Sequence, residues 1–399
     1  MRPLSLAAIL AVAALWSATD AFAQEVLEEE TGSTAAPEQI SGIDWSVGLR
    51  GSYAANSLTG GKPSASLTPE VSLTLGGESS VTTYGAGSEL IVDGAGQARV
   101  ADVHAGVTSS LRLGATTNLA GSINGKLTQL DPSDSSLPVN TLIAPLVLDG
   151  TAQGIATQDL GHVDATLTLD GKRLVTGPTT LADLSTVDNS DKSYWQGGAT
   201  LRLGYELTPL LSTFVEGEAS VQKFDAPDPT LLKYLDGRTY QLRAGVSFVQ
   251  GSMISVEASI GRGWLDYVDG TITDTQDWVY NGSVTVRPDE TVSLTGALET
   301  TLGPSTNVPG DTDVGYLLSG TARYEVNPWL TLRATSSWDR TVTLGTGDES
   351  WGLDAGVGLD YRSSRHIVWS ADYAYARDYA PPTPLNDTHT VSVGVRVNR

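Results

Sequence analysis

The sequence lacks cysteine entirely, and only 4 of its 399 residues are histidine. Without cysteine there is no disulfide framework, no thiolate metal site and no thiol nucleophile. Charged residues make up 18% of the chain, below the roughly 25% that is usual for soluble domains. The formal net charge of −22 leaves no basic surface that would bind nucleic acid.

Long hydrophobic runs are absent after the first residues of the chain. Residues 4–16 are almost wholly apolar and precede the small-residue motif Ala21-Phe22-Ala23. This pattern predicts a secretory signal peptide over residues 1–23, cleaved after Ala23. No cysteine follows that site, which excludes a lipoprotein anchor, and no later segment has the roughly 18 unbroken apolar residues of a membrane helix. We therefore expect export across the inner membrane of a Gram-negative bacterium.

Apolar and polar residues alternate with a period of two from Asp44 onward, the pattern of strands with two different faces. In residues 194–207, one face carries Trp195, Ala199, Leu201, Leu203, Tyr205 and Leu207. The other face carries Gln196, Thr200, Arg202 and Glu206. A turn centred on Pro209 would place Arg202 opposite Glu216 on the next strand, and this register keeps both faces consistent.

About 18 such segments follow one another along the chain, with 16 as the alternative count. They are 45–55, 65–76, 81–93, 99–114, 119–130, 146–157, 161–172, 194–207, 211–222, 240–248, 254–260, 278–287, the run after 290, 316–326, 330–338, 351–361, 367–375 and 388–397. Segment 146–157 has the weakest pattern. Strands of roughly 9–11 residues suffice to cross a membrane when they are tilted.

Short turns and long polar connections alternate between these segments. The connections 225–237, 303–313 and 380–387 are long. This asymmetry, together with an even strand number that leaves both termini on one side, is typical of outer-membrane barrels with tight periplasmic turns and long outer loops. We therefore expect an all-β, transmembrane, antiparallel up-and-down β-barrel over residues 44–399, preceded by an acidic periplasmic tail over 24–43. A secreted β-sandwich or solenoid would also alternate and is the alternative.

Aromatic rings with a polar edge dominate the aromatic residues: there are 9 tryptophans and 14 tyrosines but only 4 phenylalanines. Many of them fall near predicted strand ends, where an interfacial girdle must lie. The candidates are Trp45, Tyr53, Trp195, Tyr205, Tyr240, Trp278, Tyr324, Trp329, Trp338, Trp351, Tyr361, Trp369 and Tyr379. The general enrichment of aromatic residues in strands is the alternative explanation.

Short segments on these strands resemble a known family. They are Tyr84-Gly85-Ala86-Gly87-Ser88-Glu89-Leu90, Leu201-Arg202-Leu203-Gly204-Tyr205-Glu206, Phe214-Val215-Glu216 and Ala371-Asp372-Tyr373. Over roughly residues 65–397 the chain is similar to the outer-membrane barrel family of alphaproteobacteria labelled putative beta-barrel porin 2. The resemblance implies a fold and a location more firmly than a substrate. It also implies a final aromatic residue read by the barrel-assembly machinery, whereas this chain ends in Val397-Asn398-Arg399.

The polar faces carry charges of both signs, which we predict to line a pore. The candidates are Arg202, Glu206, Glu216, Glu218, Arg243, Glu257, Arg287, Glu299, Arg323, Glu325, Arg333, Asp372 and Arg396. Such a wall would impose a transverse field and a weak ion preference. Cross-strand pairs that only rigidify the wall are the alternative for any single residue. The long loop 173–193 is a candidate for an inward-folded constriction.

The sequence offers no site for catalysis, a metal or a cofactor. The four histidines lack metal-ligand spacing, so no zinc site is expected. His389 and Ser392 have opposite parity on one strand and lie on different faces, which argues against a serine–histidine pair. The glycine motif at 94–96 has no strand–helix context, so no nucleotide site is expected. We predict that the protein is not an enzyme.

The expected function is therefore a porin for passive diffusion of small hydrophilic solutes, because about 18 strands leave an aqueous channel. A non-conducting barrel that is structural, or that binds a surface partner through its loops, is the alternative. The expected partners are outer-membrane lipid, the barrel-assembly machinery and small solutes or ions. A homotrimer is left open, and the expected location is the outer membrane.

Overall fold

A computed structural model describes residues 41–399, apart from 58–59, 78, 95, 97, 131, 133–136, 139, 306–307, 309 and 380–384. The predicted signal peptide, with its cleavage residues Ala21 and Ala23, lies outside the described residues, as does most of the predicted tail 24–43. The first strand begins at Ser41, slightly before the predicted boundary at Asp44.

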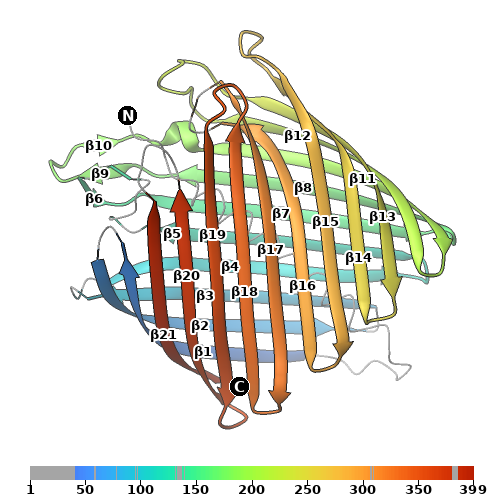
Figure 1. Cartoon of the computed structure of the whole chain (residues 1–399), viewed down its shortest axis with the longest axis horizontal. Helices are drawn as coiled ribbons and strands as arrows, with labels where there is room; N and C mark the ends of the chain where they lie inside the picture. Colours follow the sequence, from blue (N-terminus) through green and yellow to red (C-terminus); the bar gives the residue numbers. More distant parts are fainter. Residues whose placement is uncertain are drawn as a thin grey trace.

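A single antiparallel sheet of 18 strands accounts for most of the described chain (Figure 1). Its strands are β1 (Ser41–Asn56), β2 (Gly60–Gly76), β3 (Ser80–Asp93), β4 (Ala98–Leu113), β5 (Thr117–Gln129), β7 (Leu146–Asp159), β8 (Val163–Thr176), β11 (Tyr194–Thr208), β12 (Leu211–Phe224), β13 (Gly237–Gln250), β14 (Ile254–Tyr267), β15 (Thr275–Asp289), β16 (Val292–Pro304), β17 (Thr312–Asn327), β18 (Leu330–Thr343), β19 (Glu349–Arg362), β20 (Ile367–Tyr379) and β21 (Asn386–Asn398). The expected 18 strands are confirmed, including the weakly patterned segment 146–157.

The sheet closes into a barrel because β1 pairs on both of its edges. It pairs with β2 along its whole length and with β21 from Ser46, opposite Asn398, to Asn56, opposite Thr388. A sheet in lipid must close in this way, since lipid offers no hydrogen-bond partner to an open edge. The short turns gather at one end of the barrel and the long connections at the other (Figure 1). We call these the short-turn end and the long-loop end; β1 starts and β21 finishes at the short-turn end.

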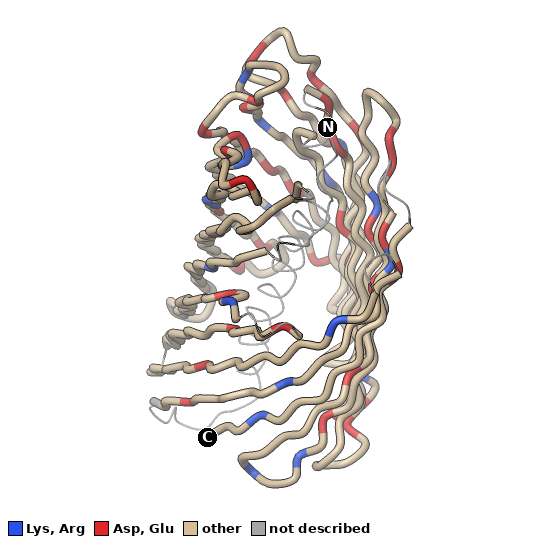
Figure 2. The backbone as a smooth tube through the Cα atoms, turned by 90° about the vertical axis from the view of Figure 1, so that its left-hand side faces the viewer, with Lys and Arg blue, Asp and Glu red and all other residues tan. Residues whose placement is uncertain are grey.

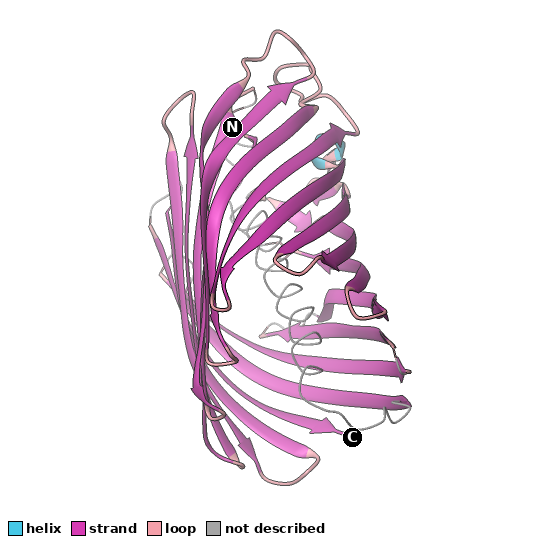
Figure 3. Ribbon diagram, turned by 90° about the vertical axis from the view of Figure 1, so that its right-hand side faces the viewer, coloured by secondary structure: helices cyan, strands magenta, loops and turns pink. Residues whose placement is uncertain are grey.

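Each strand separates an apolar face from a polar face. In β11, Leu203 is 50% exposed, whereas the side chain of Arg202 beside it is 25% exposed. Arg202 lies opposite Glu216 in the β11–β12 ladder, so the register predicted from the alternation is confirmed. Figure 3 shows that strands make up both facing walls of the molecule.

At the long-loop end, β16 and β17 leave the ring and fold inward. The β15–β16 ladder stops at Gly282 opposite Leu298, while β16 and β17 stay paired as far as Pro304 opposite Thr312. Leu302 then lies against β14: a Cβ atom on Gly263 would be 3.2 Å from Leu302 Cδ2. The infolded end is tied down by the hydroxyl of Tyr267, which donates a hydrogen bond of 2.6 Å to the carbonyl oxygen of Asp311.

An apolar cluster fills the space beneath these infolded ends. This inner apolar cluster consists of Phe224, Leu235, Leu265, Tyr267, Ile272, Leu302 and Val314, all buried. Burial of a large apolar side chain contributes roughly 1.5–3 kcal/mol, which offsets the ladder hydrogen bonds that β15 and β16 lose. Side chains also cap the freed edge of β15. The Trp278 N–H donates to Asp277 Oδ1 (2.7 Å), and the Tyr280 N–H donates to Thr300 Oγ1 (3.1 Å).

Residues 173–193, the candidate constriction, are ordered by a second, small sheet at the long-loop end. It joins β6 (Thr141–Ile143), β9 (Thr179–Leu181) and β10 (Thr186–Val187), and the 3₁₀ helix η1 (Ser190–Lys192) follows (Figure 1). That this segment narrows a path stays a prediction. Among the described residues, no helix is long and apolar enough to cross a membrane.

Candidate functional site

The charged residues predicted for the pore wall fall on one face of the sheet wherever a ladder register places them. The registers place Arg202, Glu206, Glu216, Glu218, Arg243, Glu257, Glu299, Arg323, Glu325, Arg333, Asp372 and Arg396 at positions that alternate with the exposed apolar residues. Arg287 lies in the irregular stretch of β15 between Val286 and Asp289, where the register shifts. Figure 2 shows basic and acidic residues interspersed along the strands as well as in the loops. That these residues line an open path stays a prediction.

Ion pairs that cross several strands identify this face as the concave one. Arg202 on β11 binds Glu257 on β14 through two parallel contacts of 2.7 Å each, although β12 and β13 lie between them. Neighbouring strands are about 4.8 Å apart, so such a reach requires a sheet that curves toward the side chains. The polar face is therefore the inner face of the barrel, and the apolar face is the outer one.

The Arg202 guanidinium is held in place by its neighbours on the inner face. Its Cζ lies 3.6 Å from the ring centroid of Phe214, which is buried. Phe214 can lie flat across β13 because position 245 is glycine, where a Cβ atom would overlap the Phe214 ring. Beside it, Arg243 forms an ion pair with Glu216, and their side chains are only 11% and 13% exposed. Partly buried ion pairs such as this one, and two-contact pairs such as Arg202–Glu257, are stronger than exposed single contacts.

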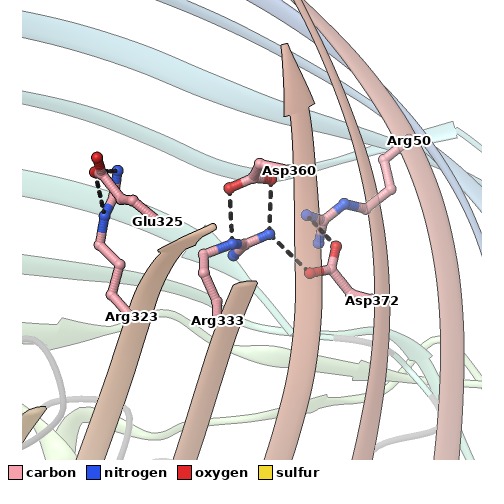
Figure 4. A network of polar contacts seen from close by, with 6 residues as sticks. All are labelled: Arg50, Arg323, Glu325, Arg333, Asp360 and Asp372. Atoms are coloured by element: carbon pink, nitrogen blue, oxygen red, sulfur yellow. Dashed lines mark hydrogen bonds and ion pairs between the residues drawn. The ribbon is translucent and has the colours of Figure 1, made fainter. Parts of the chain in front are cut away.

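A second network joins the other half of the ring (Figure 4). Arg333 on β18 lies 2.8 Å from Asp360 on β19 and 2.9 Å from Asp372 on β20. Asp372 in turn accepts a hydrogen bond of 3.2 Å from Arg50 on β1, across the seam where the barrel closes. Arg323 lies 2.9 Å from Glu325 on the same face. The first strand is thus connected by side chains to β20, over the last strand β21, which lies between them.

Glycine at one position makes the Arg333–Asp372 contact possible. In the ladders, Gly358 on β19 lies between Arg333 and Asp372. A Cβ atom there would overlap Asp372 Oδ1. The absence of a side chain at Gly358 therefore lets the carboxylate lie over β19 and reach the guanidinium.

Several charged residues of the inner face escaped the sequence-based prediction. Lys172, which is buried, lies 3.6 Å from Asp149 across the β7–β8 ladder. Arg50 and Asp360 belong to the network described above. Asp339 and Asp354 lie diagonally across the β18–β19 ladder, opposite Gly352 and Ser337, and form no ion pair among the described residues. Each has the parity of its strand's polar face, so alternation was a sufficient signal for all of them.

The predicted interfacial aromatics all have outer parity or lie in a turn, and all except Trp351 are exposed. They form two groups. Trp45, Tyr205, Tyr324, Trp329, Tyr361 and Trp369 lie toward the short-turn end, and Tyr53, Trp195, Tyr240, Trp278, Trp338, Trp351 and Tyr379 lie toward the long-loop end. Two separated groups match the two interfaces of a bilayer better than a uniform strand enrichment does. Outer Tyr84, Tyr280 and Tyr373, also exposed, were missed.

Beyond the strand end of β12, Asp225 binds Arg173 of β8 through contacts of 2.8 and 2.5 Å. These hydrogen bonds hold the pKa of the Asp225 carboxyl below its usual value.

No group of three or more metal-ligating side chains occurs in the part of the chain that the structure describes. The outer-face position of His389, 2.8 Å from the Tyr373 hydroxyl, separates it from the inner Ser392, as the alternation predicted.

A family model described as "Putative beta-barrel porin 2" matches residues 70–399. No curated protein matches the chain in sequence. The solved structures that match the chain include the following three. OpdL of Pseudomonas aeruginosa is 15% identical, with a TM-score of 0.44 over 90% of this chain and 98% of that one. OccAB4 of Acinetobacter baumannii is 12% identical, with a TM-score of 0.42 over 91% and 99%. A mutant of the ferric enterobactin receptor of Pseudomonas aeruginosa, solved with enterobactin, is 10% identical, with a TM-score of 0.51 over 91% and 82%.

Proposed function

The chain belongs to the putative beta-barrel porin 2 family, and from this premise we propose that it is an outer-membrane channel for passive diffusion of small hydrophilic solutes. The observation that carries the proposal is a closed ring of 18 strands whose concave face holds arginine–carboxylate networks. Rings of this size leave an aqueous interior, whereas eight strands are filled by their own side chains.

The path that we propose runs along two charged sectors. One sector holds Arg202, Arg243 and Glu257, and the other holds Arg333 and Asp372. Fixed charges of both signs on facing walls favour hydrated, polar solutes over apolar ones, because displaced water is replaced by charge-assisted contacts. The infolded ends of β16 and β17 would narrow this path at the long-loop end.

Unpaired carboxylates add a preference for cations to this proposal. Asp164, Asp170, Asp277, Asp339 and Asp354 have inner parity and form no ion pair in the described part of the chain. The inner arginines, in contrast, are mostly engaged by carboxylates. A wall with uncompensated negative charge concentrates cations within a Debye length, about 10 Å at 0.1 M salt.

Planar-bilayer recording of the refolded full-length mature chain tests the proposal. We expect stepwise conductance and, under a salt gradient, a reversal potential of the sign that cations produce. A folded barrel that inserts and never conducts would refute the channel and favour the structural or surface-binding alternative. Inserted protein is verified independently by protease protection and by the gel shift of the unheated, folded form.

Export and assembly complete the proposal. We propose that residues 1–23 are a signal peptide cleaved after Ala23, and that the barrel-assembly machinery inserts the chain although it ends in Val397-Asn398-Arg399. Mass spectrometry of protein purified from outer membranes tests the cleavage: Gln24 is the expected first residue, and any intact Met1 form in that fraction counts against it.

A further inference from the structure

The outer face carries a group of basic residues near the long-loop end of neighbouring strands. Arg173 on β8, Lys223 on β12, Arg238 on β13 and Arg262 on β14 form this outer basic patch. Each shares its parity with exposed apolar residues on the same strand, such as Leu169, Val221, Leu242 and Ile260. Lys223 and Arg238 are close neighbours, since Val221 lies opposite Arg238 in the ladder.

Two of these side chains lie on tryptophans that face outward. Arg173 Cζ is 4.9 Å from the ring of Trp195, and Arg262 Cζ is 5.0 Å from the ring of Trp278. The two indoles are 59% and 48% exposed. Tryptophan prefers the membrane–water interface, so a guanidinium stacked on it lies at headgroup depth.

Most of the basic residues of the patch form no ion pair among the described residues. Only Arg173 has a carboxylate partner, Asp225. Lys223, Arg238 and Arg262 form no ion pair with a carboxylate within the described residues. Two other outward arginines at this end are neutralised, since Arg340 binds Glu349 and Arg377 binds Asp387. Asp266 lies opposite Arg238 in the β13–β14 ladder with the same outer parity, but no ion pair joins the two. In a chain with a formal net charge of −22, three cations without an ion pair on one part of the outer face are a local exception.

We infer that the outer basic patch binds the phosphorylated headgroup of a lipid in the outer leaflet, with the acyl chains against the apolar residues below. This inference rests on the proposed orientation, in which the long-loop end faces the outside. The position of the cations favours a lipid over a soluble anion: they lie on the membrane-facing side, at the level of the indoles. Each lysine or arginine near a negatively charged lipid headgroup adds a similar amount to the attraction between the protein and the lipid.

Lipid titration of the detergent-solubilised full-length mature barrel, followed by native mass spectrometry, tests the inference. The ligand is diphosphoryl lipid A, compared with the same lipid after removal of both phosphates and with inorganic phosphate alone. We expect the phosphorylated lipid to bind at least about tenfold more tightly than the dephosphorylated form. Equal binding of the two lipids would overturn the assignment. Displacement of diphosphoryl lipid A by inorganic phosphate at the same concentration would overturn it as well.

Substitutions in the outer basic patch give a second test of the inference. Lys223→Gln, Arg238→Gln and Arg262→Gln, combined, should lose the preference for the phosphorylated lipid, whereas the matched pair Arg340→Gln and Arg377→Gln should retain it. The single variant Arg238→Gln, at an exposed position, gives a partial loss even if the triple variant folds poorly. Unchanged binding in the triple variant, or an equal loss in the matched pair, contradicts the inference.

Single-channel conductance should be the same in all variants, since none alters the inner face. A failure of lipid binding can therefore be distinguished from a failure of the channel.

Discussion

At the scale of single residues, the inner wall depends on where side chains are absent as much as on where charges stand. Gly358 and Gly245 leave room for Asp372 and Phe214 to lie across a neighbouring strand. Those two side chains then position Arg333 and Arg202. A strand glycine is costly in isolation, so its use here is explained by the contact it permits.

Replacement of Gly358 by alanine should break the Arg333–Asp372 contact. The added methyl group would overlap the carboxylate, and overpacking of this kind costs about 1–3 kcal/mol. We expect a lower urea midpoint of unfolding in detergent. Gly85→Ala is the matched control, because a Cβ atom at this inner-face glycine meets nothing within 4 Å. Equal destabilisation of the two variants would show that the contact is irrelevant.

Acid should weaken the Arg173–Asp225 pair. The pKa of Asp225 is lower in the folded chain than in the unfolded chain, where it is about 3.9. The pair therefore stabilises the fold above that unfolded value, and the stabilisation is lost as the pH falls through the lowered folded pKa. We expect Asp225→Asn to melt at a lower temperature than the parent protein at pH 7 and to converge with it near pH 2. Arg173→Gln should show the same pH dependence of the melting temperature. If only one of the two variants changes that pH dependence, the Arg173–Asp225 pair is not its cause.

At the scale of elements, the β15–β16 junction departs from a regular barrel. The two strands part above Gly282 and Leu298, and the inner apolar cluster takes the place of ladder hydrogen bonds. Thr300 closes the junction, since its hydroxyl accepts from the Tyr280 N–H and donates to the Tyr280 carbonyl at 2.8 Å. The infolded ends are thus fixed by one apolar contact surface and one side-chain cap.

Thr300→Val keeps the shape of the side chain and removes its hydroxyl. Loss of both hydrogen bonds leaves two backbone groups of Tyr280 unsatisfied, at a cost of about 1–3 kcal/mol. Amide hydrogen exchange should speed up around Tyr280 and over residues 299–304. Thr295→Val is the control on the same strand, because its hydroxyl contacts only the exposed Thr321 hydroxyl. Unchanged exchange near Tyr280 would exclude the capping role.

At the scale of the whole molecule, closure converts a two-faced sheet into two different environments. The outer face carries two groups of exposed aromatics, and the inner face collects arginines and carboxylates. Since the basic inner residues are mostly paired, the charge that is left over on the inner face is negative, with Asp339 and Asp354 as the pair nearest the long-loop end of β18 and β19.

Replacement of Asp339 and Asp354 by asparagine should therefore reduce the preference for cations. We expect the cation-to-anion permeability ratio to fall by roughly twofold at 0.1 M salt and to change little at 1 M, where the Debye length is about 3 Å. Reversal potentials under matched salt gradients measure this permeability ratio. Glu349→Gln, an outward carboxylate paired with Arg340, serves as the control and should leave the ratio unchanged. A twofold loss in the control as well would mean that the net charge of the protein, not the inner face, sets the preference.

Much of this protein follows from period-two alternation alone. A strand sends successive side chains to opposite faces, so the 18 segments, their register at Arg202 and Glu216, and the parity of each predicted wall residue could be read along the chain. The tertiary structure decided the rest. Arg202 binds Glu257 three strands away and not its ladder partner Glu216, and β16 and β17 leave the ring for an apolar cluster. Three cations that form no ion pair among the described residues share one region of the outer face. These features depend on curvature and on the packing of distant strands, which alternation within one strand does not encode.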